Sequence, residues 1–180
     1  MAANAVTVLG IRLGSPLALP ECSYSRIDSQ TVIFNEANQH DCYQIETTSG
    51  RTTLRSNDNI FVSWASQPTI AISDADVQLV GGKAEGIGVN TAGIKTQQAD
   101  LQALIDKFGK PTSLQTVPMG NAMGAVFDTV RARWLLPDGT HVTYTSADDR
   151  IDRGLISIST PAGRAYTKAQ LAKLNAGPGL

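Results

Sequence analysis

The sequence predicts an α+β protein in which helices pack on one face of an antiparallel β-sheet, and three observations lead to this prediction. Charged residues make up only 17% of the 180-residue chain, and glycine is frequent, a composition typical of β-rich globular proteins. Residues 96–108 have the pattern of one amphipathic helix, and residues 130–144 have the pattern of a hairpin.

The helix prediction depends on an apolar stripe that lies between two end signals. Thr96 precedes the stripe and suits an N-cap, while Gly109 and Pro111 follow it, as they do at many helix C-termini. The stripe has the i, i+3, i+4, i+7 spacing of one buried helix face. Its members are Leu101, Leu104, Ile105 and Phe108.

The register of the hairpin follows from its turn, Pro137-Asp138-Gly139. A three-residue loop with glycine in the left-handed conformation pairs Trp134 with Val142 and gathers the apolar residues on one face. A two-residue loop would scatter them. The expected core face carries Val130, Ala132, Trp134, Val142 and Tyr144. The expected open face carries Arg131, Arg133, Leu135, His141, Thr143 and Thr145.

Other segments predict shorter elements. We expect a strand over 6–13, a short helix that begins at Ser15-Pro16 and stops before Pro20, and a C-terminal helix over 167–175 with Leu171 and Leu174 inward. Glycines predict tight hairpin turns at 48–50 and 81–83. The remaining expected strands are 31–34, 42–47, 51–55, 59–64 with a continuation over 69–72, 76–80, 84–90 and one around 156–158.

Segments 10–13 and 86–89 are similar in type, and each is followed by a glycine, a helix-start signal and later strands. This echo predicts two diverged tandem modules, 1–83 and 84–180, of which the first is degenerate and the second ends in the short helix.

The second half of the chain carries a resemblance to a known family. The residues concerned are the segment 86–93, the helix with its Gly109-Lys110-Pro111-Thr112 ending, and the tryptophan strand with its Asp-Gly turn. Over 84–160 these resemble the tandem β-lactamase-inhibitor-protein-like modules, and also small outer-membrane-assembly lipoproteins with related modules. The resemblance implies a secreted or periplasmic protein whose open sheet face binds another protein. The inhibitor family's open face is rich in aromatic residues, whereas this one is not, which speaks against inhibitor activity.

The cysteines and the N-terminus bear on the compartment. Cys22 and Cys42 are the two cysteines of the chain, and a disulfide between them would stabilise the fold by roughly 3 kcal/mol. The alternative is a pair of buried thiols in a cytosolic protein. Residues 3–5 have the small-x-small pattern of a signal-cleavage site, although no signal peptide is present as written and an ordinary flexible start is the alternative. We expect a periplasmic or secreted protein.

Composition and motifs also narrow the function classes. A net charge of −1 with no basic run speaks against nucleic-acid binding. The sequence also lacks an apolar run of about 18 residues, so we expect no transmembrane segment. Two distant histidines do not make a zinc site, and the acidic residues near Asp74 and over 148–152 lack EF-hand spacing. We therefore expect no metal and no cofactor.

Three functions remain open. The favoured hypothesis is non-enzymatic binding of another protein through Arg131, Arg133, His141 and Thr143, with a Met119–Met123 loop as an adaptable neighbour. The second is a hydrolase-like enzyme centred on His141 and the Asp148–Asp152 turn, for which no G-x-S-x-G motif is present. The third is a structural subunit of an envelope or secretion assembly.

Overall fold

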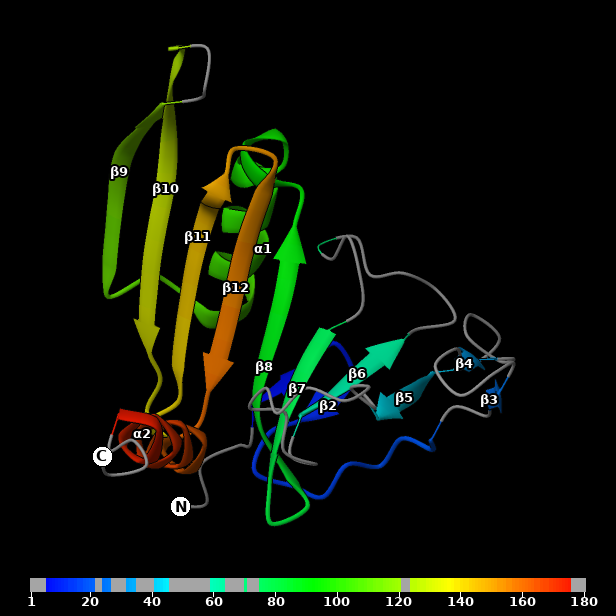
Figure 1. Ribbon diagram of the computed structural model, residues 1–180. Coiled ribbons are helices and arrows are strands. Elements are labelled where there is room, and N and C mark those ends of the chain that lie inside the picture. The colour runs from blue at the N-terminus through cyan, green and yellow to red at the C-terminus, as the bar shows by residue number, and fades with distance from the viewer. Residues whose placement is uncertain are drawn as a thin grey trace.

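The computed structural model describes residues 6–21, 24–26, 32–34, 41–45, 59–63, 70, 75–120 and 124–175. In this part of the chain, strands and two α-helices surround one apolar core (Figure 1). The elements are β1 (Thr7–Val8), β2 (Ile11–Arg12), β3 (Tyr24–Arg26), β4 (Val32–Phe34), β5 (Cys42–Ile45), β6 (Asn59–Ser63), β7 (Ala75–Val80), β8 (Lys83–Thr91), η1 (Gly93–Lys95), α1 (Gln97–Phe108), β9 (Ser113–Gly120), β10 (Val126–Leu135), β11 (His141–Arg150), β12 (Arg153–Ser159) and α2 (Pro161–Asn175).

Six strands form the body of an antiparallel sheet in the order β7, β8, β12, β11, β10 and β9, and the shorter strands β6 and β5 continue it beyond β7. Two small hairpins, β1–β2 and β3–β4, pair apart from this sheet. The α+β class and the antiparallel sheet are therefore confirmed. Among the described elements, no helix is long and apolar enough to cross a membrane.

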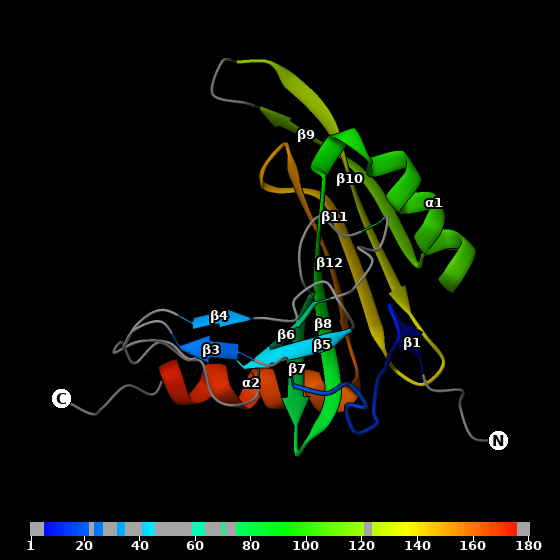
Figure 2. The same cartoon turned by 90° about the vertical axis from the view of Figure 1, so that its right-hand side faces the viewer.

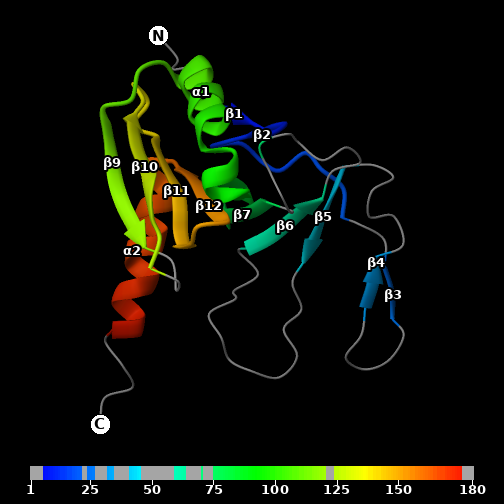
Figure 3. The same ribbon diagram turned by 90° about the horizontal axis from the view of Figure 1, so that it is seen from above.

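The two helices lie on opposite faces of the sheet (Figures 2 and 3). Side chains alternate between the faces of a strand, and α1 lies with the β1–β2 hairpin over Val89 and Ile156. Helix α2 lies instead over Gly86, Gly88 and Ser157. The expectation that the helices share one face is wrong for α2, because the chain leaves β12 on the side away from α1.

Helix α1 has the bounds and the buried stripe that the sequence predicts. Leu104 is buried, and the other members of the stripe pack against the core. Gly109 ends the helix with a φ of 79°, and its N–H donates to the Ile105 carbonyl. The Thr96 hydroxyl donates to a carboxylate oxygen of Asp100 at 2.7 Å, and it makes no hydrogen bond to the helix backbone.

The hairpin register is also confirmed. Trp134 pairs with Val142 and Ala132 pairs with Tyr144, while the N–H of Leu136 donates to the Thr140 carbonyl across the loop at 2.9 Å. All five residues of the expected core face are buried. Because a shift of one residue would turn each of them to solvent, burial and turn geometry agree on this register.

The N-terminal predictions need correction. Residues 6–13 form a tight hairpin in place of one strand, because Leu9 and Gly10 both adopt positive φ, at 50° and 81°, the combination that a type I′ turn requires. The helix expected after Ser15 is absent, and Pro16 forms a β-bridge with Lys83. Within the described residues, the first half therefore has no counterpart of α1, and tandem modules are not shown.

Some of the other predictions for the N-terminal half are confirmed, and some concern residues outside the described part of the chain. The strand over 31–34 is present as β4, and the Gly81–Gly82 turn joins β7 to β8. The expected turn at 48–50 and the strand over 51–55 lie outside the described residues. Strand β5 pairs with β6, in antiparallel register.

Helix α2 begins six residues before the predicted start. Thr160 is its N-cap, since the Gly163 N–H donates to the Thr160 hydroxyl at 3.1 Å, and Pro161 occupies the first helical position, where proline is favoured. Leu171 and Leu174 are 53% and 43% exposed, so the expectation that they point into a core is wrong. The strand positions beneath this part of α2 are glycine and serine, which leave space under the helix.

Trp134 joins α1 to the sheet. Its indole N–H donates to the Gly109 carbonyl at 2.7 Å, and its ring centroid lies 6.4 Å from that of Phe108. We predict that Trp134→Phe lowers the free energy of unfolding by about 1–3 kcal/mol, because it leaves that carbonyl without a donor. Urea unfolding followed by circular dichroism measures the change.

The matched control is Leu135→Ala, one residue further along β10 and 58% exposed on the opposite face. We expect it to change stability by less than about 0.5 kcal/mol. Equal stabilities of Trp134→Phe and the wild type would contradict the role given to the indole.

Candidate functional site

The sheet face opposite α1, here called the open face, is the candidate functional surface. In Figure 2 the β9–β10 hairpin bends toward the side on which α2 lies, so that α2 and this hairpin frame the face from two ends. Strand β10 pairs with β11 only over 131–135, whereas its first residues pair with β9. The hairpin therefore extends beyond the rest of the sheet.

A central row of residues crosses the open face from strand to strand. Arg133 pairs with Thr143, Thr143 with Ser157, Ser157 with Gly88, and Gly88 with Asp76. With neighbouring strands about 4.8 Å apart, Arg133 and Asp76 stand on either side of a strip of small residues. Arg133 and Asp76 are both exposed.

The neighbouring row contains the predicted histidine. His141 is exposed and pairs with Leu135 on one side and Ser159 on the other, and Ser159 pairs with Gly86. The structure thus brings Arg133, His141 and Thr143 together, as the sequence predicts for the open face. Arg131 lies in the row on the other side of the central row, opposite Thr145.

The charges on the open face are mostly positive. Arg131, Arg133 and Arg153 lie on its strands, and Arg164 and Lys168 lie on the adjoining helix α2. Neither Arg131 nor Arg133 forms an ion pair with any carboxylate in the described ranges. The sequence shows no basic run, because these five positively charged side chains come from three different elements and meet only in the folded protein.

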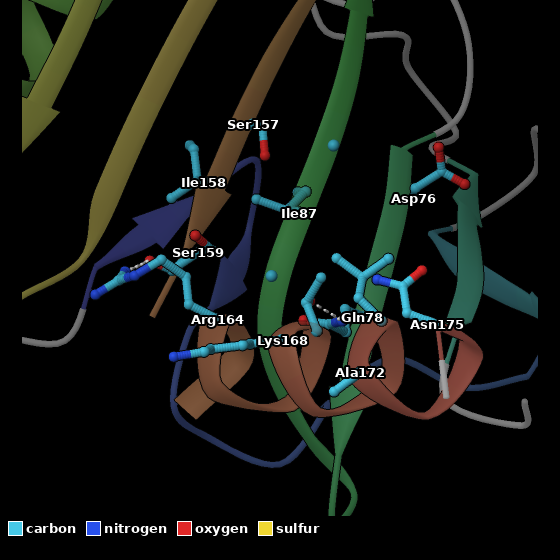
Figure 4. A pocket seen from close by; sticks show the side chains of 14 residues that line it. Asp76, Gln78, Ile87, Ser157, Ile158, Ser159, Arg164, Lys168, Ala172 and Asn175 are labelled. Carbon is cyan, nitrogen blue, oxygen red and sulfur yellow. Dashed lines mark hydrogen bonds between the residues drawn. The ribbon is translucent and has the colours of Figure 1, made fainter. Parts of the chain in front are cut away.

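A groove of about 720 Å³ lies between α2 and the open face (Figure 4). Its floor is made by small residues of β8 and β12, and α2 forms one wall. The residues concerned are Gly86, Gly88, Ser157 and Ser159 on the floor, and Arg164, Thr167, Lys168, Leu171, Ala172 and Asn175 on the wall. The sequence analysis missed this groove, although Thr160-Pro161 was an available signal for the helix that builds it.

Met119 lies on the protruding hairpin. It pairs with Phe127, and both side chains are partly buried. Strand alternation places Met119 on the same face as Arg131, since Arg131 pairs with Gln115 and both pairs have the same parity. Met123, the other methionine of the expected loop, lies outside the described residues.

The two halves of the hydrolase-like hypothesis lie apart. His141 is the first residue of β11, and the Asp148–Asp152 turn follows at the other end of the strand. Six strand residues lie between His141 and Asp148, which places them roughly 20 Å apart. Arg150 donates two hydrogen bonds to Asp152, at 2.9 and 2.6 Å, and these bonds lower the Asp152 pKa. The structure therefore brings no carboxylate of this turn to His141.

The titratable groups in the core lie on the covered face. Asp100 is 4% exposed, and burial raises its pKa despite the hydrogen bond from Thr96. Burial and the charge of Asp100 together raise the pKa of Tyr144. Asp100 belongs to α1 and Tyr144 lies on the sheet face that α1 covers, so neither group reaches the open face.

The structure describes one of the two cysteines of the predicted disulfide. Cys42 is fully buried on β5, and the described part of the chain has no free cysteine. Cys22 lies outside the described residues, so the bond between the two stays a prediction. In the same part of the chain, no three histidine, cysteine or acidic residues cluster as metal ligands.

Comparison with known proteins finds no match among protein-family models, curated sequences or solved structures. The resemblance to the inhibitor-like modules therefore stays a prediction.

The buried Asp100 gives stability a defined pH dependence. Its folded pKa lies above the ordinary value of 3.8, so its stabilising contribution is complete below that value and is lost as pH rises through the folded pKa. We predict that wild type loses stability relative to Asp100→Asn as pH rises from about 3.5 toward neutral, because asparagine does not titrate. Urea unfolding at a series of pH values measures this difference.

A difference between the two proteins that is independent of pH would contradict the raised pKa. Asp106→Asn is the matched control, since Asp106 lies on the same helix and is exposed.

Proposed function

We propose that the protein is a non-enzymatic protein-binding module that acts outside the cytoplasm through its open face. The observation that carries this proposal is a positively charged sheet face that none of the described elements covers and that α2 and the β9–β10 hairpin frame. Arg131 and Arg133 are exposed on this face without a carboxylate partner among the described residues. Complementary charge across an interface favours encounter and excludes wrong partners.

The surroundings of His141 support binding over hydrolysis. The residues beside it in its row are Leu135 and Ser159, and a general base needs an orienting partner and a reacting group within about 3 Å. An exposed histidine between arginines and threonines suits hydrogen bonding to a partner. The structural-subunit hypothesis stays a prediction beside this proposal.

The extracytoplasmic location is part of the proposal and is supported by the fully buried Cys42. A disulfide to Cys22 would form in an oxidising compartment, where such bonds persist. The residues between the two cysteines include β3 and β4, which pair with one another and not with the main sheet. A covalent closure would hold this part of the chain to β5.

The binding proposal predicts that reversing two charges removes the partner. We expect Arg131→Glu/Arg133→Glu to weaken retention of partner proteins from the periplasmic or secreted fraction by about tenfold or more, because like charges then oppose across the interface. Affinity capture with quantitative mass spectrometry provides the measurement.

Lys110→Glu is the matched control, since it makes the same kind of charge change between α1 and β9. Proteins captured equally by wild type and both variants would contradict the use of the open face.

The compartment proposal predicts no titratable thiol in the native, non-reduced protein and two after denaturation with reductant. Reduction should also lower the free energy of unfolding by about 3 kcal/mol, the chain-entropy estimate for a loop of this length. Thiol titration and urea unfolding provide the two measurements. Two reactive thiols in the denatured, non-reduced protein would contradict the predicted disulfide and would remove the main support for an extracytoplasmic site of action.

A further inference from the structure

The groove under α2 is wedge-shaped, because α2 is attached to the sheet mainly through its first turns. Gly163 touches β8 so closely that a Cβ there would lie 2.4 Å from the Glu85 carbonyl oxygen. The Arg164 guanidinium donates to the carbonyls of Ser159 and Gly139 at 2.8 and 2.9 Å. Gln78 donates to the Thr167 hydroxyl at 2.9 Å. These bonds close the groove at the start of the helix.

The later turns of α2 face the sheet across open space. Residues 164, 167, 168, 171, 172 and 175 line the groove, which is the spacing of a single helix face. Leu171 belongs to this face and is nevertheless 53% exposed, because the floor beneath it is glycine and serine. Protein interiors rarely leave such gaps, and Leu171 therefore presents apolar surface to a gap that the described residues leave open.

The dimensions of the groove fit an extended chain. From residue 164 to residue 175 the helix rises roughly 17 Å at 1.5 Å a residue, which matches about five residues of extended peptide at 3.3 Å each. A helix is about 10 Å across and would have to lift α2 away from the Gly163 contact. Glycine at 88 lets a peptide backbone approach the sheet closely, whereas the Gln78 side chain already fills the space over Gly86.

The charges at the groove define the chemistry of the segment. Arg164 and Lys168 contribute two positive charges to the wall and Asp76 one negative charge to the far side of the floor, while Arg133 continues the positive surface beyond it. Acidic side chains are therefore favoured near the first half of α2, and an apolar side chain is favoured beside Leu171. A nucleic acid is less well matched, because the chain has a net charge of −1 and offers few phosphate contacts.

Building on the proposed protein-binding function, we propose that this groove receives an extended acidic segment of the partner protein. Its backbone lies over Gly88, its carboxylates face Arg164 and Lys168, and one apolar side chain packs against Leu171.

The test fills the floor of the groove without disturbing the fold. A Cβ on Gly88 would make only an ordinary contact, 3.7 Å from the Asp76 Cβ, and the backbone there is not left-handed. Valine is favourable in a strand, so Gly88→Val should fold while it blocks a peptide. Thr145→Val is the matched control, because Thr145 lies on the open face but does not line the groove.

The probe is a short fluorescent peptide in which glutamate alternates with leucine, compared with one in which lysine replaces glutamate. Fluorescence anisotropy should show that the wild type and Thr145→Val bind the acidic peptide in preference to the basic one. We expect Gly88→Val to bind the acidic peptide about tenfold more weakly. Lys168→Glu should reverse the preference between the two peptides.

Equal affinity of wild type and Gly88→Val, or no preference for the acidic peptide, would overturn the groove proposal. The capture experiment with Arg131→Glu/Arg133→Glu keeps the two proposals apart. If that variant still loses its partner proteins while Gly88→Val retains them, the open face binds the partner and the groove does not.

Discussion

The hydrogen bond from the Trp134 indole to the Gly109 carbonyl joins α1 to the core face of the sheet. Gly109 ends α1 with a left-handed backbone, and its carbonyl is one of the terminal helix groups that lack an intrahelical donor. The indole meets this need from β10 at 2.7 Å, while its ring packs near Phe108. Polar and apolar contacts therefore hold the end of α1 to β10, while at its start Ser146 donates a hydrogen bond to the Gln97 side chain at 2.9 Å. Arg133 and Leu135, on either side of Trp134 in β10, face outward.

Glycine has two opposite effects on the other face. At Gly163 the missing side chain lets α2 touch the backbone of β8. At Gly88 the missing side chain leaves space open under the later turns of the same helix. The first turn of α2 therefore packs against the sheet, while a gap separates its later turns from the sheet. The groove is a consequence of where small residues lie on β8 relative to the helix, and no loop takes part in forming its described walls.

The parts of the fold that sequence predicted correctly are those with local signals. The Pro137-Asp138-Gly139 turn sets a register that five buried residues support, and the α1 stripe lies between two clear ends. The N-terminal hairpin was missed because Leu9 adopts positive φ, which is uncommon for a bulky residue. The start of α2 carried a readable signal, Thr160-Pro161, which was overlooked.

The groove and the side of the sheet that α2 occupies depend on strand order. That β8 lies between β7 and β12 is a property of the whole chain, and no local pattern contains it. Only this order places Gly88 beside Ser157 and brings α2 over both. The candidate residues Arg131, Arg133, His141 and Thr143 were predictable because they share one hairpin, whereas the α2 residues that complete the surface were not.

The net charge of −1 conceals an uneven distribution of charge, and this unevenness matters for recognition. Asp76 is the acidic side chain at the groove, whereas others lie away from the open face: Asp100 is on the buried side of α1, Asp106 lies on the same helix, and Asp138 lies in the hairpin turn. The arginines of β10 and the cations of α2 remain on one side. A protein with little overall charge exerts no strong long-range attraction, so discrimination must come from short-range complementarity across the interface. A basic face that contains a strip of small residues provides both parts of such discrimination, since charge selects the sign of the partner and the floor of the groove selects its shape.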